Sequence, residues 1–142
     1  MANVTNLIPY PQTALSADAV CTAAKTTEND LTNAVLLYTA PAGAPAIVTR
    51  LTANPRATVT ASRLKLYVCR AAAPTVPCFV REKLMAARTV NETTVGTEVD
   101  FGYTNDDPLK LGAGDLVYVA SGVALAGGIA FHAEVEEFEA AA

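Results

Sequence analysis

The sequence predicts an all-β protein, a single antiparallel β-sandwich or jelly roll of about eight strands. Ala, Thr and Val fill 60 of the 142 positions, and β-branched side chains fit the pleated surface of a strand. Hydrophobic residues make up 51% of the chain, which favours a packed core over a disordered chain. Strand-like segments recur at short intervals, which is typical of a sandwich rather than of alternating strands and helices.

The first 17 residues are expected to form an extended N-terminal arm. They contain Pro9 and Pro11, and proline fixes φ and removes a backbone donor, so a place in a sheet interior is disfavoured. Four apolar residues are candidates for anchoring this arm on a neighbouring subunit: Leu7, Ile8, Tyr10 and Leu15. Residues 18–142 are then expected to form the sandwich domain.

Turn residues define the expected strands in order along the chain. The strands span residues 20–26, 34–39, 46–52, 58–70, 79–84, 93–100, 115–121 and 129–136. From the strand at residues 34–39 onward, the strands are separated by turn segments that are rich in Pro, Gly, Asn and Asp. These segments are residues 41–45, 54–55, 74–77, 105–108, 112–114 and 127–128. A short helical turn is considered at residues 84–88, because Leu, Met and Ala favour helix.

Two expected strands alternate clearly between apolar and polar residues. In residues 58–70 the apolar face holds Leu64, Leu66 and Val68. The opposite face is then expected to be polar, with Cys69 more accessible than a core thiol. This face holds Arg63, Lys65, Tyr67 and Cys69. The last strand places four residues inward: Ile129, Phe131, Ala133 and Val135.

Charge is unevenly distributed along the chain, although the net charge is only −4. Residues 50–88 have a balance of +7, and residues 89–142 have a balance of −9. Ion pairs between neighbouring strands of one fold would explain this distribution. A bipolar surface that docks on copies of itself or on an acidic scaffold would also explain it. Three arginines are candidates for contacting an acidic surface: Arg50, Arg56 and Arg63. A nucleic-acid partner is not expected, because the chain lacks a strong basic footprint with interleaved aromatic residues.

The three cysteines, Cys21, Cys69 and Cys78, form no Cys-x-x-Cys pair, so a zinc site is not expected. Cys69 and Cys78 flank a Pro-containing segment that suits a hairpin loop. A disulfide between them is one interpretation, with Cys21 then free or bonded to another chain. Three free thiols are the other interpretation. It is favoured because no secretory signal is expected, since no basic residue precedes Lys25.

No arrangement of residues predicts catalysis, a metal site or a cofactor. His132 is the only histidine, and no Gly-x-Ser-x-Gly motif is present. Four loop acids are candidates for calcium ligands, but solvated carboxylates are the simpler interpretation: Asp100, Asp106, Asp107 and Asp115. The uncharged stretch 116–131 has 16 residues, fewer than a membrane-spanning helix needs, so no membrane partner is expected.

Two stretches carry a resemblance to a known class of proteins. They are Leu36-Leu-Tyr-Thr-Ala-Pro-Ala-Gly-Ala-Pro-Ala-Ile-Val-Thr-Arg-Leu51 and residues 101–131, which include Leu109-Lys-Leu-Gly-Ala-Gly-Asp-Leu-Val-Tyr-Val119. Together they resemble small β-sandwich virion proteins of tailed bacteriophages. The pattern at 109–119 is also similar to the late hairpin of jelly-roll trimers.

The resemblance implies a non-enzymatic virion subunit that is made in the cytoplasm of a bacterial host. It implies a homo-oligomer, with a trimer favoured, and a major capsid protein or neck and tail proteins as partners. A head decoration subunit that stabilises the assembled capsid is the first expectation. A neck, collar or tail-sheath accessory protein with interchain disulfides is an alternative, and a carbohydrate-binding jelly-roll module is another.

Overall fold

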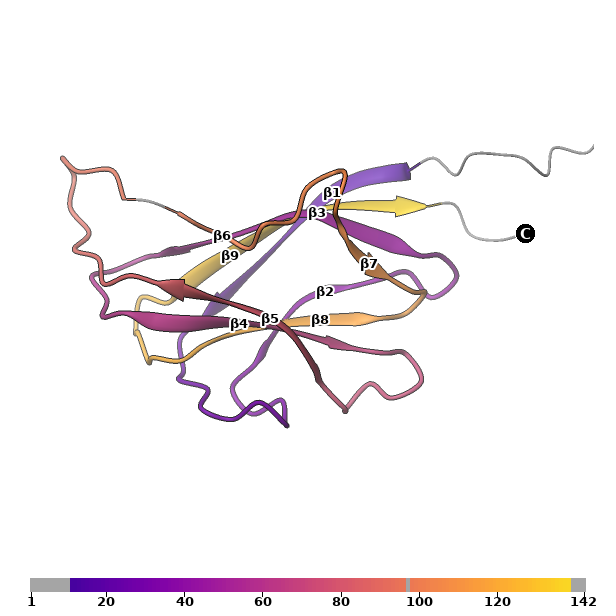
Figure 1. The fold of residues 1–142 in the computed structure, drawn as a ribbon, viewed down its shortest axis with the longest axis horizontal. Coiled ribbons are helices and arrows are strands. Elements are labelled where there is room, and N and C mark those ends of the chain that lie inside the picture. The colour runs from indigo at the N-terminus through magenta and orange to yellow at the C-terminus, as the bar shows by residue number, and fades with distance from the viewer. Residues whose placement is uncertain (1–10, 97, 139–142) are drawn as a thin grey trace, which may run out of the picture.

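The computed structural model describes residues 11–96 and 98–138, and it places nine β-strands and no helix in them. The strands form two antiparallel sheets, one of five strands and one of four. The two sheets lie as separate layers, with β1, β3 and β9 in the upper layer of Figure 1 and β4, β5 and β8 in the lower one. The prediction of an all-β antiparallel sandwich is confirmed.

Sheet A has the strand order β1-β9-β3-β6, and β7 also pairs with β3. Its strands are β1 (Pro11–Cys21), β3 (Ala46–Pro55), β6 (Val99–Asp100), β7 (Leu109–Leu111) and β9 (Ile129–Phe138). Strand β6 pairs with Thr52 and Ala53, whereas β7 pairs with residues 46–48. The two short strands therefore pair with opposite ends of β3.

Sheet B has the strand order β2-β8-β4-β5. Its strands are β2 (Val35–Thr39), β4 (Ser62–Cys69), β5 (Cys78–Met85) and β8 (Leu116–Ser121). Strands β2 and β5 are its two outer strands, and every pairing in the sheet is antiparallel. Strand β5 carries a β-bulge, where the register with β4 shifts between Leu66 and Tyr67.

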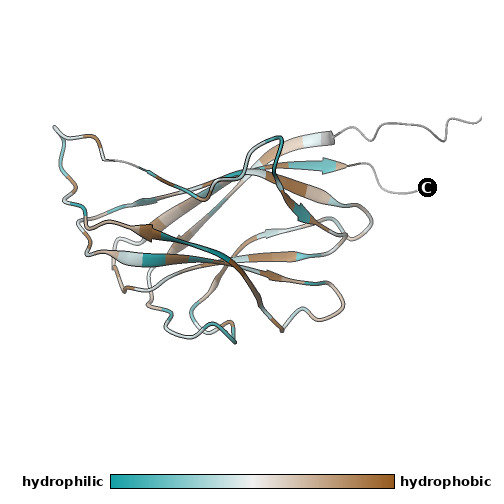
Figure 2. Ribbon diagram, viewed as in Figure 1, coloured by the Kyte–Doolittle hydropathy of each residue, from teal (hydrophilic) through white to brown (hydrophobic). Residues whose placement is uncertain are grey.

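The core lies between the two sheets and follows the predicted alternation. Leu64, Leu66 and Val68 of β4 are at most 2% exposed, and the four inward residues of β9 are at most 1% exposed. The rings of Phe101 and Phe131 pack with their centroids 6.2 Å apart. Figure 2 shows hydrophobic colour on the strands of both layers and paler or hydrophilic colour on most loops. Removing this apolar surface from water is the main force that holds the layers together.

Residues 11–17, expected in the arm, belong instead to strand β1. This strand pairs with β9 along its length, from Pro11 opposite Phe138 to Cys21 opposite Ile129. Pro11 is tolerated because it is the first residue of an edge strand, where no ladder donor is required. The N-terminal part of the expected arm, residues 1–10, lies outside the described residues.

Other elements also differ from the expectation. The strand expected at residues 20–26 ends at Cys21, and β3 continues through the break expected at 54–55. Of the described residues among 93–100, only Val99 and Asp100 form a strand, and residues 58–61 precede β4 rather than extending it. Residues 84–88 form no helical turn, because Leu84 and Met85 complete β5, and the sequence did not predict β7. The Asn91 side chain accepts hydrogen bonds from the N–H groups of Thr93 (3.0 Å) and Thr94 (2.8 Å). These local bonds form a turn in place of a strand.

Candidate functional site

Residues 22–33, which we call the strap, cover the outer face of sheet B. The Lys25 N–H donates to the Ser121 carbonyl of β8 (2.8 Å), and the Tyr67 hydroxyl of β4 donates to the Thr27 carbonyl (3.2 Å). Lys65 and Tyr67 are therefore only 2% and 0% exposed. The face of β4 opposite the core carries polar side chains as expected, but a segment distant in sequence covers it, so it is not the accessible face that was expected at Cys69.

Two buried lysines, Lys25 in the strap and Lys65 on β4, form ion pairs with acidic residues of the strap. Lys25 Nζ lies 2.7 Å from Asp30 Oδ1, and Lys65 Nζ lies 2.9 Å from Glu28 Oε1. The hydrogen bond from Lys25, with a second from Thr27, lowers the pKa of Asp30 from 3.8 to about 2. The hydrogen bond from Lys65 likewise lowers the pKa of Glu28. Each buried cation thus has a counterion, as a buried charge requires.

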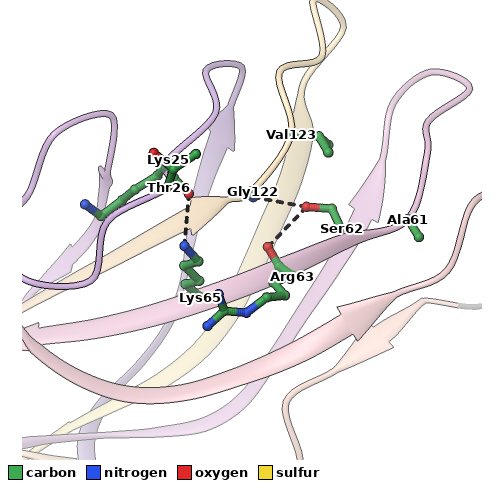
Figure 3. A pocket seen from close by; sticks show the side chains of 8 residues that line it. All are labelled: Lys25, Thr26, Ala61, Ser62, Arg63, Lys65, Gly122 and Val123. Carbon is green, nitrogen blue, oxygen red and sulfur yellow. Dashed lines mark hydrogen bonds between the residues drawn. The ribbon is translucent and has the colours of Figure 1, made fainter.

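A hollow of about 280 Å³ opens between the strap, the start of β4 and the turn at Gly122 (Figure 3). Its polar groups bond to one another. Lys65 Nζ donates to the Lys25 carbonyl (2.9 Å), and Ser62 Oγ accepts from the Gly122 N–H (3.0 Å) and donates to the Arg63 carbonyl (3.2 Å). The groups serve to hold the strap and the turn in place, and they form no nucleophile with a base.

A second hollow, of about 580 Å³, lies on the outer face of sheet A between β1, β9 and the loop that carries Asn105. Glu134 and Glu136 line it, and neither is in an ion pair with another described residue. His132 is also at its wall, where Nδ1 lies 2.6 Å from Asp18 Oδ1. The hollow offers hydrogen-bond acceptors to a polar ligand. Ser16 and Thr49 also line it, but within the described residues neither hydroxyl is hydrogen-bonded to His132 or to a carboxylate.

Two of the four acids considered as calcium ligands accept hydrogen bonds from the main chain. The Asp115 carboxylate accepts hydrogen bonds from Arg70 Nη1 (2.5 Å), the Gly112 N–H (2.8 Å) and the Ala71 N–H (3.1 Å). Burial raises the pKa of Asp115, and these hydrogen bonds overcome that effect and lower it. Asp100 accepts from the Gly102 N–H (2.8 Å). Across residues 11–96 and 98–138, no three His, Cys, Asp or Glu side chains are grouped to hold a metal ion.

The arginines proposed for assembly are placed differently from one another. Arg50 pairs with Glu98 (2.7 Å), and Arg63 pairs with Glu82 and with Glu28 (3.3 Å). Arg56 is exposed. Two of the three arginines thus form ion pairs within the fold.

The apolar residues proposed for assembly lie almost entirely outside the described residues. These are Leu7, Ile8 and Tyr10. Leu15 is half-buried in β1 and packs against the core of its own chain. The structure therefore gives Leu15 a role in the fold rather than in an arm.

Cys21, Cys69 and Cys78 are not bridged in the structure. Cys69 is 0% exposed, so the expectation that it is accessible is wrong. Cys78 is exposed and pairs in register with Val68, whose side chain faces the core. Cys69, the next residue, is on the other face, since successive side chains of a strand alternate. The disulfide stays a prediction, and this placement does not favour it.

Exposed apolar side chains are concentrated in one stretch of the chain, which the sequence analysis did not single out. Of the seven large hydrophobic residues that are exposed in the described part of the chain, five lie between residues 76 and 95. They are Val76 (63%), Val80 (39%), Leu84 (73%), Val90 (38%) and Val95 (96%). Val80 and Leu84 lie on β5, an outer strand of sheet B, whereas Val76 precedes this strand and Val90 and Val95 follow it. The exposed side chains therefore extend along β5 and past both of its ends, and exposed apolar side chains at an outer strand are candidates for an interaction site.

Comparison with known proteins finds no match to any family model, curated protein or solved structure. Within the part of the chain that the structure describes, no helix is long and apolar enough to cross a membrane.

Proposed function

We propose that the protein is a non-enzymatic structural subunit of a tailed-bacteriophage virion. The first candidate is a head decoration subunit that binds and stabilises the assembled capsid. In this proposal it is a homo-oligomer, made in the cytoplasm of the bacterial host, and the family resemblance favours a trimer.

The observation that carries the proposal is the strand order. If β6 and β7 are counted as two parts of one strand, the eight strands run 1-8-3-6 in sheet A and 2-7-4-5 in sheet B. A sandwich of eight strands built from two Greek keys is a jelly roll, and viral capsid proteins and lectins use this architecture. The order supports a jelly roll and, with the sequence resemblance, a virion subunit.

The surface supports assembly over catalysis. Five exposed aliphatic side chains lie on β5 and the segments beside it, whereas the hollow beside the strap and the hollow on sheet A hold no hydroxyl that is hydrogen-bonded to a base. A partner that covers these side chains would remove apolar area from water.

Two alternatives have a specific observation in their favour. The exposed thiol of Cys78 suits an interchain disulfide in a neck, collar or tail-sheath accessory protein. The acid-lined hollow on sheet A suits a carbohydrate-binding jelly roll, because carboxylates accept hydrogen bonds from sugar hydroxyls. The exposed large hydrophobic residues in the described part of the chain are all Val or Leu, so an aromatic platform for a sugar ring is not among them.

Immunogold electron microscopy on particles of the phage that encodes this chain tests the proposal. Label over the head supports decoration, and label at the head–tail junction or along the tail supports the accessory role. Label at fibre tips, with binding to a glycan array, supports the carbohydrate-binding module. Particles without label would contradict the proposal of a virion subunit.

A further inference from the structure

A hollow of about 290 Å³ lies where the free edges of the two sheets meet. Strand β5 is the outer strand of sheet B, and β6 is an outer strand of sheet A. The hollow is lined from both strands and from the residues next to them: Lys83, Leu84, Ala86, Glu98, Val99 and Asp100. Leu84 is 73% exposed at its rim, although leucine is the kind of side chain that folding normally buries.

The hollow carries charges of both signs. Lys83 comes from β5 and Asp100 from β6, and neither is in an ion pair with another described residue. Glu98 is already paired with Arg50 at 2.7 Å. The patch therefore combines an exposed apolar side chain, an apolar wall and one unpaired charge of each sign.

The main chain of β5 is poorly suited to pairing with another strand. The strand is bulged, and Arg81 extends from it to the Phe101 carbonyl (2.9 Å) and over the ring of Tyr103 (4.4 Å to the centroid). Bulges and charged residues that point inward are features that protect edge strands from strand addition. A partner at this edge would therefore have to bind through side chains.

We propose that this edge is a two-fold interface between two copies of this chain. Leu84 of each copy enters the hollow of the other and packs against Ala86 and Val99, while Lys83 of each copy pairs with Asp100 of the other. A two-fold interface uses the same patch on both subunits, so the patch must be complementary to itself. Charges of both signs beside one exposed apolar side chain meet that condition.

A uniformly acidic partner fits this patch less well than a second copy does. It would pair with Lys83 but would place like charges against Asp100 and Glu98. In a two-fold pair each lysine meets an aspartate. The proposal builds on the self-association in the proposed function and names its surface, and it gives a dimer instead of the trimer that the resemblance favours.

Multi-angle light scattering of the full-length protein on a sizing column gives the first test. A mass twice the 14.7 kDa of the chain is expected. Leu84→Asp should shift the protein to a monomer, because loss of a central anchor weakens an interface about thirtyfold or more. Val76→Asp is the matched control, since Val76 is also exposed (63%) but lies before β5, and it should remain a dimer.

Charge reversal gives the second and sharper test. Lys83→Glu places two acids together at each of the two symmetric contacts, and Asp100→Lys places two cations together, so each variant alone should be monomeric. An equimolar mixture of the two variants should form a dimer. In the mixed pair the introduced acid of one copy faces the introduced cation of the other, and the unchanged Lys83 and Asp100 form the second contact. A purely intramolecular contact between these residues would show no such rescue on mixing.

Circular dichroism melts establish that the variants are folded before their masses are compared. If Asp100→Lys unfolds through loss of the bond to the Gly102 N–H, Asp100→Asn keeps an oxygen acceptor and should still weaken the dimer. A wild-type monomer or trimer, a dimer unchanged by Leu84→Asp, or a mixture that stays monomeric would overturn the proposal. Immunogold labelling of particles is independent of these masses, so the virion assignment can stand or fail separately.

Discussion

Lys65 Nζ lies 2.9 Å from Glu28 Oε1, although the side chain of Lys65 is only 2% exposed and that of Glu28 is 38% exposed. The pair is therefore asymmetric. The cation is buried on β4, and the anion sits on the strap with access to water. The same arrangement recurs at Lys25 and Asp30, where the exposed fractions are 0% and 46%.

This asymmetry predicts which partner costs more to remove. Glu28→Gln leaves the buried ammonium of Lys65 without its counterion, whereas Lys65→Met leaves a carboxylate that water can solvate. Glu28→Gln should therefore lower the free energy of unfolding more than Lys65→Met does, and adding Lys65→Met to Glu28→Gln should recover part of the loss. Urea unfolding followed by circular dichroism measures the three variants. A larger loss for Lys65→Met would contradict this account.

The ion pair of the strap also predicts a loss of stability in acid. The pKa of Asp30 is lowered from 3.8 to about 2 by Lys25 and Thr27. A group with a lowered folded-state pKa contributes stability above its unfolded pKa and loses it as the pH falls through the folded one. The contribution of Asp30 should therefore disappear between about pH 5 and pH 2. Urea midpoints across this range should fall less steeply for Asp30→Asn than for the wild type. Parallel curves would contradict the assignment.

The sequence predicted the layers of the fold because alternation is a local signal. Leu64, Leu66 and Val68 face the core as expected, and so do the inward residues of β9. Alternation also placed Lys65 and Tyr67 with Cys69 on the opposite face and predicted that Cys69 is accessible there, but all three residues are buried. The strap that covers them begins about 40 residues earlier, and no local pattern reports that long-range contact.

The candidate contacts were less predictable than the fold. Clustered charge pointed to Arg50 and Arg63, but folding brings Glu98 and Glu28 beside them and satisfies these charges within the chain. The exposed apolar edge was missed because exposure depends on β5 being the outer strand of its sheet. Strand order is a property of the whole topology, and residues 78–85 do not encode it locally.

Replacing each of two buried tyrosines by phenylalanine should affect the free energy of unfolding differently. The Tyr67 hydroxyl donates to the Thr27 carbonyl (3.2 Å), whereas the buried Tyr103 hydroxyl has no hydrogen-bond partner in the described structure. Tyr67→Phe should lower the free energy of unfolding by about 1 kcal/mol. Tyr103→Phe removes a polar group that folding leaves unsatisfied, so it should be neutral or stabilising by up to about 1 kcal/mol. Thermal melts of the two variants are matched controls for each other, and equal losses would contradict the difference in bonding.

The three cysteines should differ sharply in reactivity. Cys78 is exposed, whereas burial raises the pKa of Cys21 to about 12 and also raises the pKa of Cys69. The thiolate is the reactive form, so a native chain at about pH 8 should react rapidly with Ellman's reagent at one thiol. Denaturation without reductant should then release the other two. Cys78→Ser should abolish the rapid phase, and Cys69→Ser should retain it.

The thiol count also separates the two disulfide hypotheses. A Cys69–Cys78 bridge would give no rapid phase and a single thiol after denaturation without reductant. A bridge between chains must involve Cys78, because the other two thiols are buried. It would appear as a dimer on a non-reducing denaturing gel and would disappear in Cys78→Ser. Since Lys83 and Leu84 lie on the same strand as Cys78, a disulfide that forms only in the wild-type oligomer and not in Leu84→Asp would mean that the β5 edges of two copies meet.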